Sequence, residues 1–250
     1  MINIKTPKEI EVMKTGGKIL SQVMWELIDF VKPGVSEIEI DKLAEKLIRQ
    51  KDGESGFKKV KGYGYTVCLS TNDVVVHGIP TNYKLTTGDV IGIDCGVFYQ
   101  GFHTDMSETV IVGKPKDKQK EQFLNVGKLA LKEAIRQAKV GNRVGHISKT
   151  IQDIVRKNGY SVVESLVGHG VGRNLHEEPE VPGFLIDPIE QTPLLTEGMV
   201  IAIEVIYNMG KPDLKLDKDG WTLKTKDGSL GGLFEKTVAI TKNGPLILTR

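Results

Sequence analysis

The chain has 250 residues, of which 39% are hydrophobic, and this is enough to bury the core of one large domain or two small ones. Lys and Arg total 34 against 32 Asp and Glu, so the formal net charge of +2 gives no reason to expect a nucleic-acid or membrane partner. Only Cys68 and Cys95 are present, which excludes a disulfide framework at this size. The first residues lack the apolar core of a secretory signal and no apolar run approaches a bilayer span, so we expect a soluble cytoplasmic protein.

The chain begins with the signals of a helix pair. Thr6-Pro7-Lys8-Glu9 combines an N-cap, a first-turn proline and a capping-box acid, and apolar residues follow at helical spacing until Lys32-Pro33-Gly34. Ser36 opens a second helix that runs to about Lys51. A second pair is expected further on, with a helix from Asp117 to Ala138 and a shorter one that ends at Asn158-Gly159.

Short β-rich runs follow each helix pair, which indicates an α+β fold with an antiparallel sheet covered by helices. The expected strands are Tyr65–Leu69, Val74–Val76, Val90–Phe98, Phe102–Val112, Val162–Val167, Met199–Tyr207, Trp221–Lys226 and Leu233–Thr241. A shift of 107 residues places Lys32, Gly34, Ile40, Lys42 and Arg49 on Lys139, Gly141, Ile147, Lys149 and Arg156. No linker separates the halves, about 1–115 and 116–250, so we expect one domain over 1–250 made of two repeated halves, with a site where they meet.

Two acids interrupt strands that are otherwise apolar. Asp94 lies in Val-Ile-Gly-Ile-Asp-Cys-Gly-Val and Glu204 lies in Met-Val-Ile-Ala-Ile-Glu-Val-Ile, and neither run contains a Lys or Arg. Burying an unpaired carboxylate costs several kcal/mol or more. Each of these acids is therefore expected to be protonated, paired with a cation, or bound to a metal.

A third acid lies across a predicted hairpin from Asp94. The turn at Tyr99-Gln100-Gly101 places Asp94 and Asp105 on opposite arms, within about one register step of each other. Two carboxylates at this separation repel unless a cation lies between them. Taken alone, Asp105 also fits a solvated acid on a surface hairpin, and Glu235, in the strand after the Asp227-Gly228 turn, fits a solvated strand acid better than a ligand.

Three of the five histidines, His77, His169 and His176, lie in glycine-rich segments, whereas His103 and His146 are expected to be structural. Imidazole is the commonest neutral metal ligand. Together with His169, the four acids would supply a charge of about −4, which two divalent cations would neutralise. Oxygen-rich ligation with one imidazole suits Mn, Fe, Co or Zn.

These residues occur in an order that resembles the methionine aminopeptidases. The matching segments are His77-Gly78-Ile79-Pro80, Asp94, Asp105, Gly168-His169-Gly170-Val171-Gly172, His176-Glu177, Ile203-Glu204, Trp221 to Asp227 and Glu235. The resemblance spans nearly the whole chain, and the ordered ligands with eleven residues from Asp94 to Asp105 are its most specific feature. It implies the pita-bread fold, a pseudo-twofold α+β domain.

The resemblance also implies residue roles. Asp94, Asp105, His169, Glu204 and Glu235 would bind two metal ions, with Asp105 and Glu235 bridging both. A metal-activated hydroxide, assisted by Glu204, would attack the first peptide bond. His176 would hydrogen-bond the carbonyl oxygen as it becomes anionic and His77 would serve the scissile nitrogen, while the free amino terminus would bind on the Asp94 side.

A pocket for the methionine side chain is implied at Tyr63, Cys68 and Trp221. Cys68 is expected to be a wall of this pocket and not a nucleophile. Four positions depart from the family pattern: Leu175, Val205, Phe234 and Lys236 stand where Phe, Pro, Trp or Tyr, and His are usual. None removes a ligand, so the departures bear on turnover and side-chain preference more than on metal binding.

Two alternatives remain open on the sequence. A proline-specific aminopeptidase or dipeptidase shares the five ligands but usually carries an additional amino-terminal domain, whereas this chain begins at the first helix of the catalytic unit. A binding protein that had lost catalysis would typically lack ligands. The interval from His169 to Glu204 is too short for the insertion of the second type of methionine aminopeptidase, so the resemblance is to the compact first type. It implies nascent chains with a small second residue as substrates, transient contact with ribosomes, and a monomer.

Overall fold

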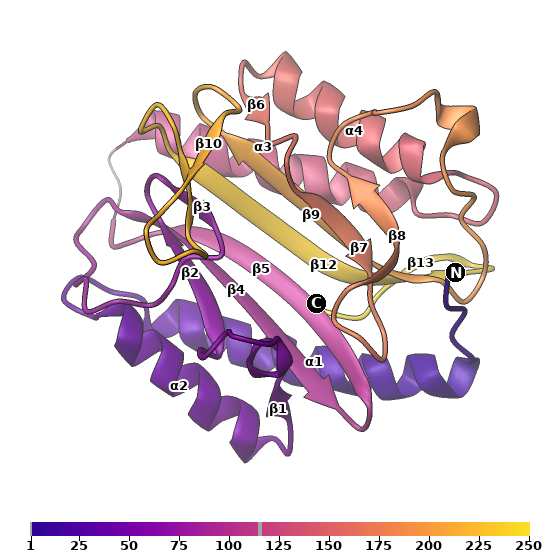
Figure 1. Ribbon diagram of the computed structural model, residues 1–250, viewed down its shortest axis with the longest axis horizontal. Helices are drawn as coiled ribbons and strands as arrows, with labels where there is room; N and C mark the ends of the chain where they lie inside the picture. Colours follow the sequence, from indigo (N-terminus) through magenta and orange to yellow (C-terminus); the bar gives the residue numbers. More distant parts are fainter. Residues whose placement is uncertain (1, 115–116) are drawn as a thin grey trace.

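The computed structural model describes residues 2–114 and 117–250, and its helices cover one face of a large antiparallel sheet (Figure 1). The helices are α1 (Pro7–Phe30), α2 (Glu37–Gln50), α3 (Lys118–Gln137) and α4 (Val144–Lys157), with short 3-10 turns η1 (Phe57–Lys59) and η2 (Ile189–Gln191). In spatial order the large sheet contains β1 (Glu54–Ser55), β4 (Val90–Tyr99), β5 (Phe102–Ile111), β12 (Gly231–Thr241), β9 (Val200–Asn208), β7 (Val167–Gly170) and β8 (Glu177–Pro182). Beside this path, β2 (Val67–Thr71) pairs with β4, β6 (Ser161–Val162) with β9, and β13 (Gly244–Ile247) with β12. A smaller sheet holds β10 (Leu214–Leu216), β11 (Leu223–Thr225) and β3 (Val74–Val76).

The predicted helices are confirmed, including their first turns. At the start of α1, the amide of Glu9 donates to Thr6 Oγ1 at 3.3 Å and the amide of Thr6 donates to Glu9 Oε2 at 2.8 Å, which is the expected capping box. Asp117 caps α3 by accepting from the amide of Gln119 at 2.9 Å. The first helix packs on β4 and β5 and the third packs on β12 and β9, so each half contributes its own helix to the same face of the sheet.

The loops between paired helices repeat from one half to the other. Gly34 follows α1 with φ 91°, and Gly141, its counterpart under the 107-residue shift, follows α3 with φ 88°. The amide of Gly34 donates to the carbonyl of Leu85 at 2.8 Å and the amide of Gly141 donates to that of Leu195 at 3.1 Å. The two related glycines therefore make similar contacts, each with a leucine carbonyl in its own half. The boundary placed between 115 and 116 falls outside the described residues, and the single-domain organisation stays a prediction.

Several strand bounds differ from the prediction. The single strand expected over 162–167 is wrong, because the chain leaves β9 after Val162, bends at Glu164 and Ser165, and returns as β7. Glu164 faces solvent there and pairs with Arg156 of α4 at 3.1 Å. No strand is predicted at β8, because its prolines argue against a strand, but β8 is the edge of the sheet and an edge tolerates a missing N–H.

The hairpin of β4 and β5 has a two-residue turn. Gln100 and Gly101 have φ values of 46° and 89°, as a type I′ turn requires. Asp94 pairs with Ser107 and Asp105 pairs with Gly96, so the predicted offset of one step is wrong and the two acids are two residues apart along the ladder. Because side chains alternate between faces, an even offset places both carboxylates on the same face.

The acids face away from the helices. In β4, Ile93 and Cys95 pack into the apolar core beneath α1 and α2, and Asp94 between them therefore lies on the opposite face. In β9, Ile203 and Val205 pack beneath α3 and α4 in the same way and flank Glu204. Within residues 2–114 and 117–250, no helix combines the length and the apolar character needed to cross a membrane.

Candidate active site

A row of polar side chains crosses the centre of the large sheet, where the two halves join. Asp94 of β4 pairs with Ser107 of β5, Ser107 pairs with Glu235 of β12, and Glu235 pairs with Glu204 of β9. Directly paired residues share a face of the sheet, and neighbouring strands are about 5 Å apart. The row therefore concentrates three carboxylates on one face, and Asp105, two residues from Ser107, adds a fourth.

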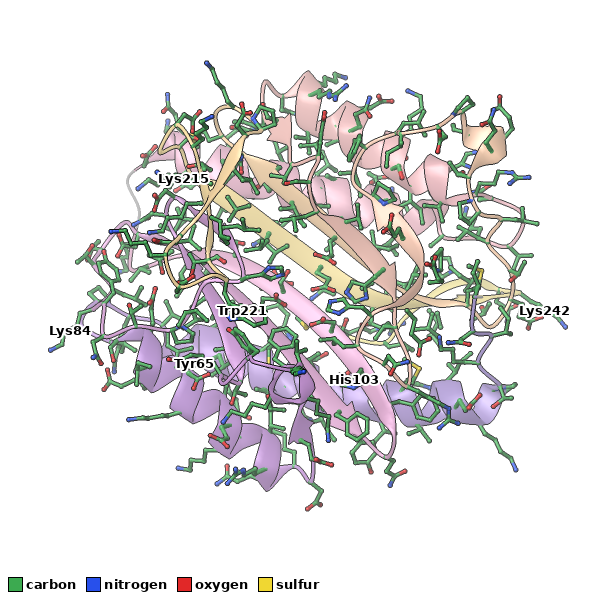
Figure 2. All side chains as sticks on the ribbon, viewed as in Figure 1. Tyr65, Lys84, His103, Lys215, Trp221 and Lys242 are labelled. Atoms are coloured by element: carbon green, nitrogen blue, oxygen red, sulfur yellow. The ribbon has the colours of Figure 1, made fainter. Side chains whose placement is uncertain are left out.

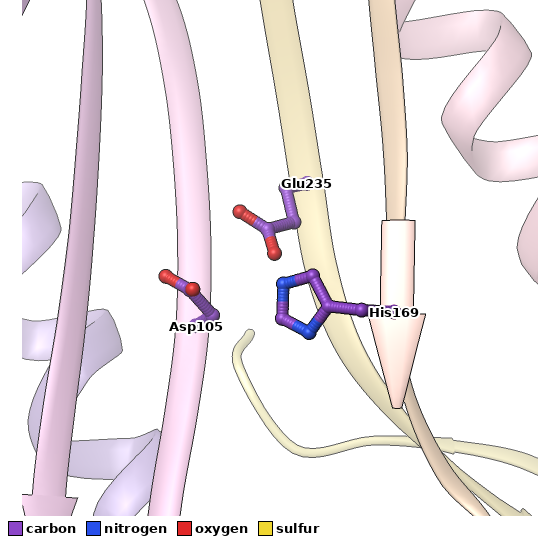
Figure 3. Close-up of side chains that lie close together, drawn as sticks. All are labelled: Asp105, His169 and Glu235. Atoms are coloured by element: carbon purple, nitrogen blue, oxygen red, sulfur yellow. The ribbon is translucent and has the colours of Figure 1, made fainter. Parts of the chain in front are cut away.

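His169 completes the cluster from the neighbouring strand β7. One ligand atom each of Asp105, His169 and Glu235 lies within 4.8 Å of the others (Figure 3). Nδ1 of His169 lies 2.8 Å from the carbonyl oxygen of Gly170, so the proton resides on Nδ1 and Nε2 presents a lone pair. Nε2 is 3.6 Å from Glu204 Oε1. Burial lowers the pKa of His169 to about 4, so the imidazole is neutral and suited to bind a metal.

The carboxylates lack the partners that buried acids need. Asp94 Oδ1 and Glu235 Oε1 are buried without a hydrogen-bond partner among the described residues. Burial raises the pKa of Asp94 to about 7, and burial together with the neighbouring acids raises the pKa values of Asp105 and Glu235 well above the usual range. Unpaired oxygens of this kind are costly without a cation. The residues present therefore fit a site for divalent metal.

The predicted site residues all line one pocket of about 150 Å³ on this face of the sheet. Its lining consists of Phe57, Val60, Tyr63, Cys68, His77, Asp94, Asp105, His169, Leu175, His176, Glu204, Trp221 and Glu235. The part away from the acids is apolar, since Tyr63 packs edge to face on Phe57 and on Trp221 with ring centroids 6.3 and 5.2 Å apart. Trp221 is labelled in Figure 2. Cys68 is buried among these rings, and burial raises the pKa of its thiol, which disfavours the reactive thiolate.

The two auxiliary histidines border this pocket from loops. His77 has a φ of 55°, and a Cβ on the following Gly78 would lie 1.9 Å from the carbonyl oxygen of Leu69, so this loop passes close against β2. The ring of His176 packs edge to face on His169 with centroids 4.4 Å apart. Both therefore lie beside the carboxylate cluster.

The remaining histidines lie outside the lining of the pocket. His103, labelled in Figure 2, is buried on β5 with its ring 4.7 Å from that of Phe98. His146 lies in the first turn of α4, where its Nδ1 accepts from the amide of Arg143 at 3.0 Å. Neither makes a contact that assigns it to the cluster.

Three of the four departures from the family pattern face the helices. Val205 and Phe234 belong to the core beneath α3 and α4, and Lys236 Nζ pairs with Glu108 at 2.7 Å on the same side. Leu175 is the exception, because it lines the pocket with Phe57. Of the four, only Leu175 is placed to change side-chain preference directly.

Two expectations are wrong in detail. Glu235 is 2% exposed and Asp105 is also buried, so neither is the solvated acid that each suggested when taken alone.

Phe57 and Val60 were not predicted to line the pocket. They lie in and just after a single 3-10 turn, which has no periodic pattern to signal burial, and the aromatic Phe57 was the only cue.

Comparisons with known proteins agree with this geometry. Residues 11–242 match the model of metallopeptidase family M24. A methionine aminopeptidase of Clostridium perfringens is 42% identical over 249 residues, covering 100% of this chain and 99% of its own. The crystal structure of methionine aminopeptidase from Thermotoga maritima covers 100% of both chains with a TM-score of 0.96 and 38% identity. The prolidase from Pyrococcus furiosus has a TM-score of 0.80 at 26% identity, and the match covers 99% of this chain but 65% of the prolidase.

The fold is therefore shared with both branches, whereas full-length coverage at high identity is found with the methionine aminopeptidases. The expected pita-bread fold is confirmed. The chain belongs to metallopeptidase family M24 and, within it, to the methionine aminopeptidases.

Proposed function

We propose that this chain removes the initiator methionine from new polypeptides by metal-dependent hydrolysis of the first peptide bond. The observation that carries the proposal is the row of buried carboxylates with His169, which faces an apolar, aromatic pocket. The relatives named above are methionine aminopeptidases, and neither the prolyl nor the non-catalytic alternative is favoured by the comparisons.

Membership of a metallopeptidase family implies divalent metal ions. We propose two of them, held by Asp94, Asp105, His169, Glu204 and Glu235, with Asp105 and Glu235 shared. Four carboxylates supply a charge of about −4, which two divalent ions balance. Mn, Fe, Co and Zn all suit oxygen ligands with one imidazole. When bound, the metal lowers the pKa of water and polarises the carbonyl group.

The remaining steps fall to side chains of this pocket. Glu204 accepts the proton of the attacking water, which requires the ionised carboxylate. His176, beside His169, donates to the carbonyl oxygen as negative charge develops there, and His77 serves the scissile nitrogen. The free amino terminus binds on the Asp94 side, so that a mid-chain peptide bond is not positioned for attack.

The apolar end of the pocket takes the methionine side chain. Phe57, Tyr63, Cys68, Leu175 and Trp221 provide its walls. Such a pocket discriminates by volume, at roughly 1–3 kcal/mol for each methylene. We further propose a preference for a small second residue, as the family resemblance implies.

Nascent chains are the substrates that this activity requires, and a cytoplasmic location and transient contact with ribosomes follow from those substrates. We propose that the enzyme acts as a monomer, as the family resemblance implies. Sedimentation of the protein alone and with ribosomes tests both statements. A dimer in solution would contradict the proposed monomer, and failure to co-sediment would contradict the proposed contact with ribosomes.

The activity is tested with metal-stripped protein that is reloaded separately with Mn, Fe, Co or Zn. We expect methionine release from Met-Ala-Ser and little release from a Leu-led or an Ala-Pro-led peptide. Asp105→Asn should abolish release, whereas Asp153→Asn, an exposed acid on α4, should not. Cleavage of the proline peptide alone would assign the chain to the prolyl branch, and no cleavage with any metal would exclude the proposal.

A further inference from the structure

The N-terminal segment, residues 2–6, packs against the loop that carries His176. This loop, residues 171–176, connects β7 to β8, and Figure 1 shows the segment ahead of α1 at the same end of the molecule. The amide of Lys5 donates to the carbonyl oxygen of Gly198 at 2.8 Å, which anchors the backbone of the segment. The side chain of Lys5 then reaches Glu177, and Nζ lies 2.7 Å from Oε2.

This ion pair is almost completely buried. The side chains of Lys5 and Glu177 are 4% and 3% exposed. Glu177 Oε2 also accepts from Asn3 Nδ2 at 3.1 Å, and Oε1 accepts from the amide of Asn174 at 3.1 Å. One carboxylate therefore joins two residues of the N-terminal segment to the loop. Burial raises the pKa of Glu177, but these hydrogen bonds outweigh it and leave the pKa below its usual range, so the carboxylate is ionised at neutral pH.

The ion pair is packed tightly against the backbone of the loop. A Cβ on Gly172 would lie 2.5 Å from Lys5 Cε and 2.8 Å from Glu177 Oε1. The loop backbone therefore touches both members of the pair. If the ammonium group were removed, the buried carboxylate would lose its counter-charge, and the loop would have to move to expose it to water.

His176 is the residue before Glu177, and Leu175 of the pocket wall precedes it. A displacement of the loop therefore moves the imidazole that packs on His169. A displacement of about 1 Å can cost about 100-fold in rate when a group must meet a transition state. The four acids proposed as metal ligands lie on β4, β5, β9 and β12, away from this loop, and His169 on β7 is held by its pairing with β8 and β9.

We propose that Lys5 is a positioning residue that holds His176 in place through Glu177, so that the N-terminal segment of the chain completes the active site. The inference rests on the role of His176 in the proposed function. Residues Lys5 and Glu177 are 172 positions apart, and their contact is made by the fold alone. Neither Lys5 nor Glu177 is among the residues that line the pocket.

The test compares Lys5→Met with Lys149→Met, which removes a lysine from an exposed ion pair on α4. We expect kcat for Met-Ala-Ser to fall about 100-fold in Lys5→Met, with KM within about twofold, because a transition-state contact is lost. Metal affinity by calorimetry should be unchanged, and Lys149→Met should behave as the parent protein. Lys5→Met combined with His176→Ala should be no slower than His176→Ala alone, since both remove the same contact. Retained kcat in Lys5→Met, or losses that multiply in the double variant, would overturn the proposal.

Two further measurements keep the test decisive. If Lys5→Met does not fold, Asn3→Ala is tested instead, because it removes the exposed hydrogen bond to Glu177. We expect this substitution to reduce kcat about fivefold when His176 is present and to have no effect in His176→Ala. An unchanged kcat in Asn3→Ala would overturn the proposal that the N-terminal segment positions His176 through Glu177. The carbon–proton NMR signal of the His176 ring should shift or broaden in Lys5→Met and not in Lys149→Met. If the parent protein releases no methionine, the proposed function fails, and this signal still decides whether Lys5 fixes the ring.

Discussion

Replacing Gly96 with alanine should narrow the pocket that we propose for the methionine side chain, without changing any of the proposed metal ligands. Gly96 pairs with Asp105 across the β4–β5 ladder and lies behind the ring of Phe57. A Cβ at this position would lie 2.8 Å from Phe57 Cε1 and 2.9 Å from Cδ1, whereas ordinary contacts begin near 3.4 Å. The ring must therefore move by about 0.5 Å, away from β4 and toward the pocket.

The magnitude follows from the size of the pocket. In a pocket of about 150 Å³, the ring displaced by one methyl group takes up space that the end of the methionine side chain needs. One methylene of mismatch is worth about 1–3 kcal/mol, so we expect kcat/KM for Met-Ala-Ser to fall about 10- to 200-fold. A peptide led by norvaline, whose side chain is one heavy atom shorter, should lose much less.

Steady-state kinetics of Gly96→Ala on the two peptides check this prediction. Gly92→Ala is the matched control, because it lies on the same strand and face and its Cβ would come no closer than 3.3 Å to Thr109 Oγ1. Metal uptake should be the same in all three proteins. Equal losses for the methionine and norvaline peptides, or no loss at all, would refute the reasoning about the ring.

Three further outcomes follow from the structure. Leu175→Ala should enlarge the pocket and lower the preference for a Met-led over a Phe-led peptide by about tenfold, measured as the ratio of the two kcat/KM values. An unchanged ratio would show that Leu175 does not determine side-chain preference. Metal affinity should weaken as pH falls from 8 to 6, because protons compete with metal: burial raises the pKa of Asp94 to about 7, and burial with the neighbouring acids raises the pKa of Asp105 well above its usual range. Calorimetry that shows tighter binding at pH 6 would contradict this sign. Gly127→Ala in α3 places a Cβ 2.5 Å from Phe234 Cδ2. The overpacking costs about 1–3 kcal/mol and should exceed the helix-propensity gain of about 1 kcal/mol, so urea unfolding should show a lower free energy of unfolding. A more stable variant would mean that the core adjusts without cost.

The sequence predicted the site because it places acidic residues within runs of apolar residues. Asp94 and Glu204 stand in runs of apolar residues, and a buried carboxylate needs a partner whatever the fold. Glu235 gave a weaker signal, since an acid in an isolated strand is ordinarily solvated. Only its position beside Ser107 and Glu204 in the assembled sheet shows that it is buried.

The parts that the sequence could not supply depend on contacts between distant residues. The offset between Asp94 and Asp105 was misjudged by one residue, because the length of a turn must be known before the ladder can be counted. The edge strand β8 contains prolines, and its tolerance of them depends on its place in the sheet. The contact of Lys5 with Glu177 has no local pattern at all. The starts of α1 and α3, by contrast, are set by local capping, and those predictions are confirmed.

The most direct test of the central claim is a crystal structure of the protein loaded with manganese or cobalt, with anomalous difference maps recorded at the metal edge. We predict two peaks in the pocket, both in contact with Asp105 and Glu235, with His169 Nε2 binding one of them. No anomalous peak among these side chains, or a peak bound only elsewhere on the chain, would contradict the claim that the row of buried carboxylates exists to hold metal.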